Sequence, residues 1–557
     1  MPSGGARLRP PRASAILVFA SLTATSCTGD TSRRPEPPPV SPDGRSMEEI
    51  ACSLPTDWLV RTARGYWPDR GGEIQLVPEE PNTMGPGLPH SGPWDHLQEV
   101  PLLWYGPGHV RAAGTVDRPV TVADIAPTQA ELLGFDFHAP DGRPMSEALS
   151  PRRHPLRLVV TMVWDAGGMD VLDEWPDRWP YLRSLRDAGT WYANATVGSS
   201  PSQTAQIHAT IGTGAFPVRH GLVSHRIRVG ERLLAPWSEN PGFIVLPTLA
   251  DLYDLSMGNR PVVGEVAGLA IQLGMMGHGS MWEGGDFDLA VIRQRENPKT
   301  LGEEADSWTL PLALSAFYRL PAYVNAVGGL EKDAARLDRE DGSLDGLWRG
   351  NAIEGLLGGF DTPARISYQT RVVEEVIRRE GFGADRVPDL LFVNYKIVDF
   401  VSHAWSMNSP EMGDAVAWHD RSLRDFISFL DGRVGAGRWV LVLTADHGAT
   451  PSLAVSGGRV ISPDLVEREL NRRLDTDGDD ARLVEYVTHT QLYLSRSELE
   501  DLGVSPEDVA RAAMTLTEGE VASEAATLPP EERDDTVFRA AYPSSILGSL
   551  RCLEDAA

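Results

Sequence analysis

Three hydrophobic runs in the chain each end in polar residues, and each predicts a buried β-strand. They are "PLRLVVTMVWDAGG" (155–168), "RVPDLLFVNYKIVDFVSHAW" (386–405) and "RWVLVLTADHGATP" (438–451). Between the last two, "DAVAWHDRSLRDFISFLDGRV" (414–434) carries apolar residues at helical spacing and predicts an amphipathic helix. Strands that alternate with helices predict an α/β fold with a doubly wound, mostly parallel sheet and helices on both faces.

Two later stretches have a less regular pattern. Residues from about 225 to 385 are rich in Gly and Trp, and we interpret this part as an inserted cap on a main body that spans 151–557. Residues 453–540 have an α+β pattern, in which "ARLVEYVTHTQLYLS" (481–495) predicts a strand.

The amino terminus predicts export. Three arginines precede the apolar run "ASAILVFASLTA" (13–24), which is too short to span a bilayer and is typical of a signal peptide over residues 1–27. The sequence "TATSC" ends at Cys27 and resembles a lipidation site, although Ala24 stands where Leu is usual. Residues 28–50 are Pro-rich and predict an extended tether. We therefore expect a protein of the cell envelope or the exterior, and the sequence leaves open whether a lipid at Cys27 attaches it to the membrane.

Length and charge narrow the function classes. The 557 residues fit one large α/β domain with insertions, or two to three domains. The formal net charge of −27 argues against binding to the phosphate backbone of DNA or RNA, because such binding requires clustered Lys and Arg. A nucleotide or another small anionic substrate can still bind where bound cations reverse the local field.

The ends of the predicted strands carry residues that bind metal ions. They are Asp165, then Asp399 with His403, and then Asp446 with His447, while a polar loop supplies Thr204. Asp and His are the usual oxygen and nitrogen ligands of zinc and similar divalent ions. One such residue alone is more often a cap or turn residue, but the set in this order predicts a metal site.

These motifs resemble the alkaline phosphatase superfamily, in particular its nucleotide pyrophosphatase/phosphodiesterase branch. The similar stretches are "VVTMVWDAGG", "SQTAQIHATIGTGAFPVRHGL", "VDFVSHAW" and "LTADHGATP". The resemblance implies two zinc ions as cofactors, one held by Asp399, His403 and His90 and the other by Asp165, Asp446 and His447 with the Thr204 oxygen nearby. It also implies that Thr204 is the nucleophile of a phosphoesterase and forms a phospho-threonine intermediate.

The last metal-binding histidine of that family follows the Asp-His-Gly motif, but here the only histidine after His447 is His489, which has the wrong sequence context. The stretch "PHSGPWDHLQEVPLLWYGPG" (89–108) is instead similar to the family's closing His loop and strand. The resemblance therefore implies a circular permutation, in which residues 51–150 are a relocated carboxy-terminal segment that supplies His90; His96 is the weaker candidate. The new chain ends would then be neighbours, so Cys52 and Cys552 would form a disulfide, although two free thiols remain the alternative.

Departures from the family bear on the substrate. His225 stands where relatives have an Asn that holds a phosphoryl oxygen, and because an imidazole can donate the same hydrogen bond, His225 is a candidate catalytic residue beside Thr204. The Lys-x-Arg pair of the monoesterases has no counterpart before His278. Since a monoester gains more from such a clamp, we expect cleavage of phosphodiester or pyrophosphate bonds.

Other interpretations stay open. The protein can be a phosphomonoesterase of the same fold or a catalytically dead binding relative, whereas a sulfatase lacks support because Thr204 has no Cys nearby. Ser202 is an alternative nucleophile, and we interpret His208 and His220 as structural. The sequence predicts neither the natural substrate nor the oligomeric state.

Overall fold

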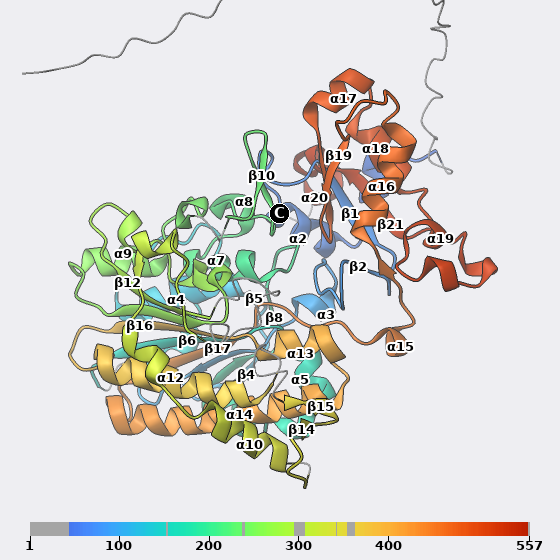
Figure 1. Ribbon diagram of the computed structural model, residues 1–557. Helices are drawn as coiled ribbons and strands as arrows, with labels where there is room; N and C mark the ends of the chain where they lie inside the picture. Colours follow the sequence, from blue (N-terminus) through green and yellow to red (C-terminus); the bar gives the residue numbers. More distant parts are fainter. Residues whose placement is uncertain are drawn as a thin grey trace, which may run out of the picture. The chain divides into compact units, whose positions relative to one another are not determined.

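The computed structural model describes residues 44–151, 154–236, 240–293, 307–340, 342–353 and 362–554 (Figure 1). The predicted signal peptide, Cys27 and most of the predicted tether lie outside these residues. Within the described ranges, no helix has the length and apolar composition needed to cross a membrane.

A nine-stranded sheet forms the centre of the described chain, and all of its strands except β3 run parallel. In order across the sheet the strands are β13 (Tyr318–Arg319), β12 (Asp288–Ile292), β11 (Val263–Ala267), β16 (Asp389–Tyr395), β6 (Leu158–Trp164), β17 (Trp439–Thr444), β3 (Leu102–Tyr105), β7 (Thr190–Tyr192) and β4 (Gly114–Val116). The sequence prediction of a mostly parallel α/β sheet is therefore confirmed.

Strand β6 is hydrophobic along its whole length because both of its faces are buried. Leu158, Val160 and Met162 pack into one hydrophobic cluster, and the alternating Val159 and Val163 pack into another on the opposite face. Successive side chains of a strand point to opposite faces, so a central parallel strand needs apolar residues at every position.

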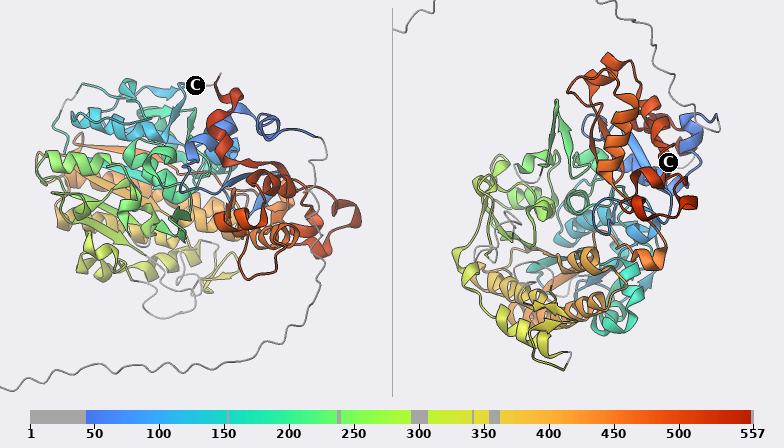
Figure 2. Two further views of the ribbon diagram at one scale, coloured as in Figure 1. Left: turned by 90° about the horizontal axis from the view of Figure 1, so that it is seen from above. Right: turned by 45° about the vertical axis from the view of Figure 1, so that its right-hand side comes forward.

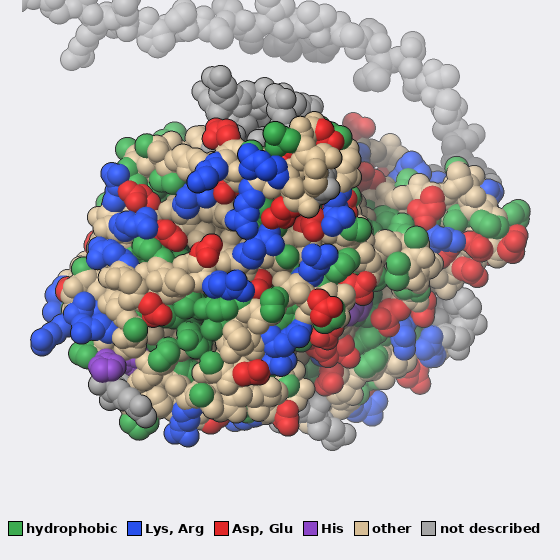
Figure 3. Space-filling model, turned by 90° about the horizontal axis from the view of Figure 1, so that it is seen from below, with side chains coloured by type: hydrophobic (Ala, Val, Ile, Leu, Met, Phe, Trp, Pro, Cys, Tyr) green, Lys and Arg blue, Asp and Glu red, His purple; other side chains and the backbone are tan. Residues whose placement is uncertain are grey.

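Helices cover both faces of this sheet, as Figure 1 shows. Helices α12 (Ala364–Glu380) and α14 (Pro410–Leu430) pack on one face. Helices α4 (Ile125–Leu133), α7 (Thr204–Thr213) and α9 (Leu249–Ser256) lie on the other. Helix α14 begins at the Ser409 cap, whose hydroxyl accepts a hydrogen bond from the Met412 N–H. Figure 3 looks onto the side of α12 and α14, where acidic side chains lie among the basic ones.

A second, four-stranded sheet is entirely antiparallel. Its order is β19 (Val484–Val487), β20 (Gln491–Leu494), β1 (Ile74–Pro78) and β21 (Phe538–Pro543). Helices α16 (Pro463–Leu474) and α18 (Pro506–Ala513) contribute to the hydrophobic cluster that covers it.

The amino-terminal segment contributes a strand to each sheet. Ile74 of β1 lies between Leu492 and Pro543 of the small sheet. In the large sheet, Leu103 of β3 pairs with Leu443 of β17 on one side and with Trp191 of β7 on the other. The segment is therefore built into the interior of both sheets.

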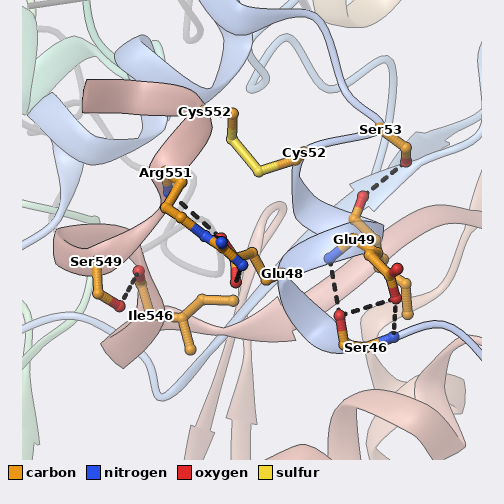
Figure 4. Close-up of a disulfide and its surroundings, with 10 residues drawn as sticks. Ser46, Glu48, Glu49, Cys52, Ser53, Ile546, Ser549, Arg551 and Cys552 are labelled. Atoms are coloured by element: carbon orange, nitrogen blue, oxygen red, sulfur yellow. Dashed lines mark hydrogen bonds and ion pairs between the residues drawn. A yellow bond between two sulfur atoms is a disulfide. The ribbon is translucent and has the colours of Figure 1, made fainter. Parts of the chain in front are cut away.

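The two ends of the described chain lie side by side, as both views in Figure 2 show. Cys52, which follows α1 (Met47–Ala51), forms a disulfide with Cys552 of α20 (Arg551–Glu554), and their Cα atoms are 6.0 Å apart. Beside it, the Arg551 guanidinium donates a hydrogen bond to the Glu48 carboxylate at 3.0 Å (Figure 4). The disulfide implied by the sequence resemblance is thus present.

The structure differs from the sequence prediction in two places. Strands β11, β12 and β13 lie within 225–385 and belong to the large sheet, so this range is not a cap alone. The predicted single strand 481–495 is a hairpin of β19 and β20, because the chain turns at Thr488–Thr490.

Candidate metal centre and active site

The predicted ligands come from the carboxyl ends of three neighbouring strands. Asp165 directly follows β6, Asp399 and His403 lie on α13 (Ile397–Trp405) after β16, and Asp446 and His447 follow β17. The carboxyl ends of parallel strands meet at one edge of a sheet, where loops collect side chains into a site.

His90 meets Asp399 and His403 although it precedes them by about three hundred positions. The His90 Nε2 atom lies 3.0 Å from Asp399 Oδ1 and 3.2 Å from His403 Nε2, and His403 Nε2 lies 3.5 Å from the same carboxylate oxygen. The His403 side chain is 36% exposed, whereas Asp399 is buried, so the cluster opens to solvent at His403.

Asp165, Asp446 and His447 form a second cluster that is fully buried. His447 Nε2 lies 3.3 Å from Asp446 Oδ2 and 3.7 Å from Asp165 Oδ1. The two clusters touch, because the His90 and His447 rings stack with their centroids 3.8 Å apart.

The donor atoms suit divalent metal ions. Asp446 Oδ2 and His447 Nε2 are buried and have no hydrogen-bond partner among the described residues, which is costly unless a cation binds there. Burial lowers the pKa of the His90, His403 and His447 imidazoles, and a neutral imidazole is the form that ligates a metal. Two sets of nitrogen and carboxylate ligands fit zinc.

Lys396 lies between the two clusters. Its Nζ is 2.7 Å from Asp165 Oδ1, 2.9 Å from Asp399 Oδ2 and 3.1 Å from the Thr204 hydroxyl oxygen. Burial alone would lower the pKa of this lysine, but the nearby carboxylates of Asp165, Asp399 and Asp446 raise it, so the ammonium stays charged.

The pKa values of the Asp399 and Asp446 carboxyls shift in opposite directions. Burial opposes ionisation of Asp399, but Lys396 and then the His403 imidazole hold the pKa of Asp399 well below its usual range. Burial and then the charge of Asp165 raise the pKa of Asp446 to about 7.

Thr204 is the first residue of α7 and is buried. Amide N–H groups at a helix amino terminus favour bound anions. The neighbouring Gln203 lies within 3.1 Å of His489 Nδ1, and its Oε1 accepts a hydrogen bond from the His225 N–H at 3.2 Å. Burial, followed by the charges of His489 and His90, holds the pKa of His225 well below its usual range, so His225 is neutral near the site.

His208 and His220 are buried in the protein interior. His208 Nδ1 donates to the Thr204 carbonyl at 2.7 Å, and its Nε2 accepts from Asn394 at 2.8 Å. Asn394 and Gln272 also donate to Asp165 Oδ2, at 3.0 and 2.8 Å, and so fix that carboxylate. His220 Nε2 lies 3.2 Å from the Thr210 hydroxyl of α7.

Three contacts hold the His90 loop against the strand ends. The Thr450 hydroxyl donates to the Pro89 carbonyl at 2.6 Å, and the Ser202 hydroxyl donates to the His90 carbonyl at 3.1 Å. A Cβ at Gly448 would lie 2.0 Å from the His96 carbonyl oxygen, so only glycine allows this approach. Ser202 and His96 therefore position the loop, and neither belongs to a metal cluster of the described residues.

The sequence prediction missed Lys396, Gln203 and the location of His489. Lys396 follows β16 by one residue and precedes Asp399 by three, so a lone lysine at a strand end was the available signal. The sequence context of His489 does not match a metal ligand of the family, yet the β19–β20 turn brings its ring to Gln203. This contact forms between elements that are far apart in the sequence, so no local sequence pattern predicts it.

Comparison with known proteins agrees with this geometry. A family model described as type I phosphodiesterase / nucleotide pyrophosphatase matches residues 159–543. The chain is 23% identical over 402 residues to a calcium-transporting ATPase of Myroides odoratus, a match that covers 65% of this chain and 73% of that protein. It is 28% identical over 158 residues to alkaline phosphatase PafA of Elizabethkingia meningoseptica, which covers 28% of this chain and 29% of that one.

Solved structures share the fold. The crystal structure of wild-type alkaline phosphatase PafA matches with a TM-score of 0.50 at 18% identity, and the match covers 70% of this chain and 85% of that chain. The predicted alkaline-phosphatase-like fold is therefore confirmed.

Proposed function

Since the chain belongs to the type I phosphodiesterase / nucleotide pyrophosphatase family of phosphoester hydrolases, we propose that it cleaves phosphodiester or pyrophosphate bonds at Thr204. The observation that carries this proposal is the position of the Thr204 hydroxyl, 3.1 Å from the Lys396 ammonium, which also contacts Asp165 of one ligand cluster and Asp399 of the other. The substrate is a small phosphoester, including a nucleotide.

Two zinc ions are the proposed cofactors. His90, Asp399 and His403 would hold one, and Asp165, Asp446 and His447 would hold the other, close to Thr204. When bound, the ions supply positive charge that favours the anionic form of a hydroxyl and offsets the charge of a phosphoryl group. The unpartnered Asp446 and His447 atoms support this assignment.

The proposed reaction runs in two displacements. The Thr204 oxygen loses its proton to solvent and attacks phosphorus, so that the Oγ–P bond forms while the bond from phosphorus to the leaving oxygen breaks. The leaving oxygen takes a proton from water. Water then attacks phosphorus, releases phosphate or a phosphate monoester, and restores the Thr204 hydroxyl. The Lys396 ammonium favours the alkoxide of Thr204, and the amino terminus of α7 favours the anionic phosphoryl group.

The proposed preference for diesters rests on the charges near Thr204. Lys396 is the basic side chain that contacts the Thr204 hydroxyl among the described residues, and His225 is neutral. Beyond the two proposed ions, a single cationic side chain suits the monoanionic phosphoryl group of a diester better than the dianionic group of a monoester. A phosphomonoesterase is the second candidate, because similar proteins include alkaline phosphatases. A catalytically dead binding protein is the third.

We also propose that residues 51–150 are a relocated carboxy-terminal segment and that the protein is exported, with Cys27 as the residue for a lipid anchor. The place of β3 inside the large sheet and of His90 beside Asp399 supports the relocation. A chain with residues 44–151 moved behind residue 554 should keep its activity, because Cys52 and Cys552 already adjoin.

The decisive experiment compares zinc-loaded wild type with Thr204→Ala and Ser202→Ala. We expect Thr204→Ala to lose turnover of bis-p-nitrophenyl phosphate and p-nitrophenyl phosphate while it keeps its zinc. Ser202→Ala should retain turnover, because Ser202 contacts only the backbone of the His90 loop and the contacts at Thr450 and Gly448 still hold that loop. Full activity of Thr204→Ala would overturn the proposed nucleophile, and a higher kcat/KM on the monoester would favour the second candidate.

A further inference from the structure

A group of acidic side chains outside the active site lies next to the small sheet. Asp477 and Asp479 belong to the loop "DTDGDD" (475–480) between α16 and β19, and Glu498 lies in α17 (Arg496–Leu502). One ligand atom from each of the three side chains lies within 4.8 Å of the others. The loop and the helix thus bring three carboxylates to one point.

Glu498 is the unusual member of this group. Asp477 and Asp479 are exposed, but Glu498 is only 4% exposed, and its Oε2 has no hydrogen-bond partner among the described residues. A buried carboxylate is unfavourable unless it is paired, protonated or bound to a metal ion. Its ligand atom faces two further acids instead of a cation.

The two aspartates keep an oxygen available. Asp477 Oδ1 accepts a hydrogen bond from the Asp479 N–H at 3.1 Å, and Asp479 Oδ1 accepts one from the Ala481 N–H at 2.7 Å. Each carboxylate has a second oxygen, so three side chains can offer oxygen atoms to one ion.

The nearest arginines in the sequence do not neutralise the group. Arg482 pairs with Glu467 at 2.5 Å, and Arg496 lies 3.8 Å from Glu73. Burial raises the pKa of the Glu498 carboxyl, and the charges of Asp479 and Asp477 raise it further. These arginines therefore do not offset the negative charge of the three carboxylates.

A second acidic group offers a comparison within the same chain. Asp254, Asp286 and Asp288 also bring one ligand atom each within 4.8 Å. Burial and neighbouring carboxylates raise the pKa of Asp288, but the Arg319 guanidinium opposes that shift. The Arg319 guanidinium, which also pairs with Glu380 at 2.8 Å, adds some positive charge beside this second group, so we expect the group to bind metal more weakly.

We propose that Asp477, Asp479 and Glu498 bind one calcium ion. The ligand set contains only oxygen atoms, which favours a hard cation over zinc. Calcium suits it better than magnesium because calcium accepts several carboxylates in a flexible geometry, whereas magnesium demands a near-ideal octahedron and keeps its waters.

The ion would join the α16–β19 loop to α17, which follows β20. Both elements border the four-stranded sheet that holds β1 at its interior. Calcium would therefore stabilise the folded small sheet without contact with the phosphoester site.

The test is a calcium titration of the zinc-loaded protein by calorimetry and by thermal unfolding. We expect one calcium ion to bind with Kd between about 1 µM and 1 mM, and Tm to rise with calcium because only the folded state holds the site. The same concentration of magnesium should raise Tm less. Asp479→Asn should weaken calcium binding at least about tenfold, and it should fold because Asp479 is exposed.

Two further variants keep the result decisive. Glu498→Gln should raise Tm in the absence of calcium, since it removes a buried repelling charge, and should abolish the calcium-dependent rise. Asp286→Asn, the matched change in the other acidic group, should leave calcium binding intact. No binding up to about 10 mM calcium, or loss of binding in Asp286→Asn with retention in Asp479→Asn, would overturn the proposal.

Discussion

The ammonium nitrogen of Lys396 lies 3.1 Å from the hydroxyl oxygen of Thr204 and donates a hydrogen bond to it. The same nitrogen contacts Asp165 of one ligand cluster and Asp399 of the other. A fixed positive charge thus belongs to the site before any ion binds. It links the candidate nucleophile to both clusters.

Replacement of this lysine should slow turnover without loss of the metal ions. We expect Lys396→Met to lower kcat/KM of the zinc-loaded enzyme by about 100-fold, the scale on which removal of one preorganised donor acts. Zinc content, measured by mass spectrometry of metals, should stay the same. The exposed Lys332 gives the matched control, Lys332→Met. Unchanged turnover in Lys396→Met would contradict a role at the reaction centre.

Replacement of the His90 imidazole should remove one metal ion. His90→Ala takes a nitrogen from the cluster with Asp399 and His403, so bound zinc should fall from about two equivalents to about one. Turnover should fall with it. His96→Ala is the control from the same loop, because the His96 ring packs near Trp94 and the clusters do not include it. Equal zinc loss in both variants would mean that zinc binding depends on the fold of the loop and not on the His90 imidazole.

The fold and the ligand residues were predictable to the extent that they follow local patterns. Strand β6 is apolar at every position because both faces are buried, and Asp165 follows it directly. Strand β13 has only two residues, Tyr318 and Arg319, so no periodicity marks it and its membership of the large sheet was missed. The contact of Lys396 with Thr204 joins residues 192 positions apart, and its formation depends on the packed sheet.

Acid should destabilise the protein through His419, which is buried against Trp164 and Tyr395. Burial lowers its pKa to about 3, below the value of about 6.5 in an unfolded chain. The unfolded state therefore binds the proton first, and stability falls as pH drops from 6.5 towards 3. Relative to His419→Phe, the wild type should lose about 2 kcal/mol of unfolding free energy between pH 6.5 and 5.

Urea unfolding of both zinc-loaded proteins at the two pH values measures this difference. Acid also affects other groups, including carboxylates whose pKa is raised, such as Asp389 at about 7, but these are present in both proteins and cancel. If the difference in unfolding free energy between wild type and His419→Phe did not change with pH, His419 would not be the titrating group.

Loss of the Cys52–Cys552 disulfide should weaken the native state. We expect Cys52→Ser to lower the free energy of unfolding by about 2–4 kcal/mol, because the bond restricts a very long loop in the unfolded chain. Glu48→Gln, which removes the adjacent exposed ion pair with Arg551, should change little. Denaturant unfolding of the oxidised proteins compares the two, and an unchanged midpoint in Cys52→Ser would refute the expectation.

The interior position of β1 and β3 has a consequence for how the protein is made. The ribosome delivers both strands early. Strand β7, one partner of β3, follows soon, but β17, β20 and β21 emerge more than three hundred residues after the strands with which they pair. Until then the nascent chain exposes both edges of β1 and one edge of β3 with unmet backbone hydrogen bonds, a state that favours aggregation. Both sheets are therefore complete only after nearly the whole chain has been translated. A chain truncated before residue 538 lacks β21, so β1 becomes an edge strand whose backbone groups on that side have no hydrogen-bond partner in the sheet.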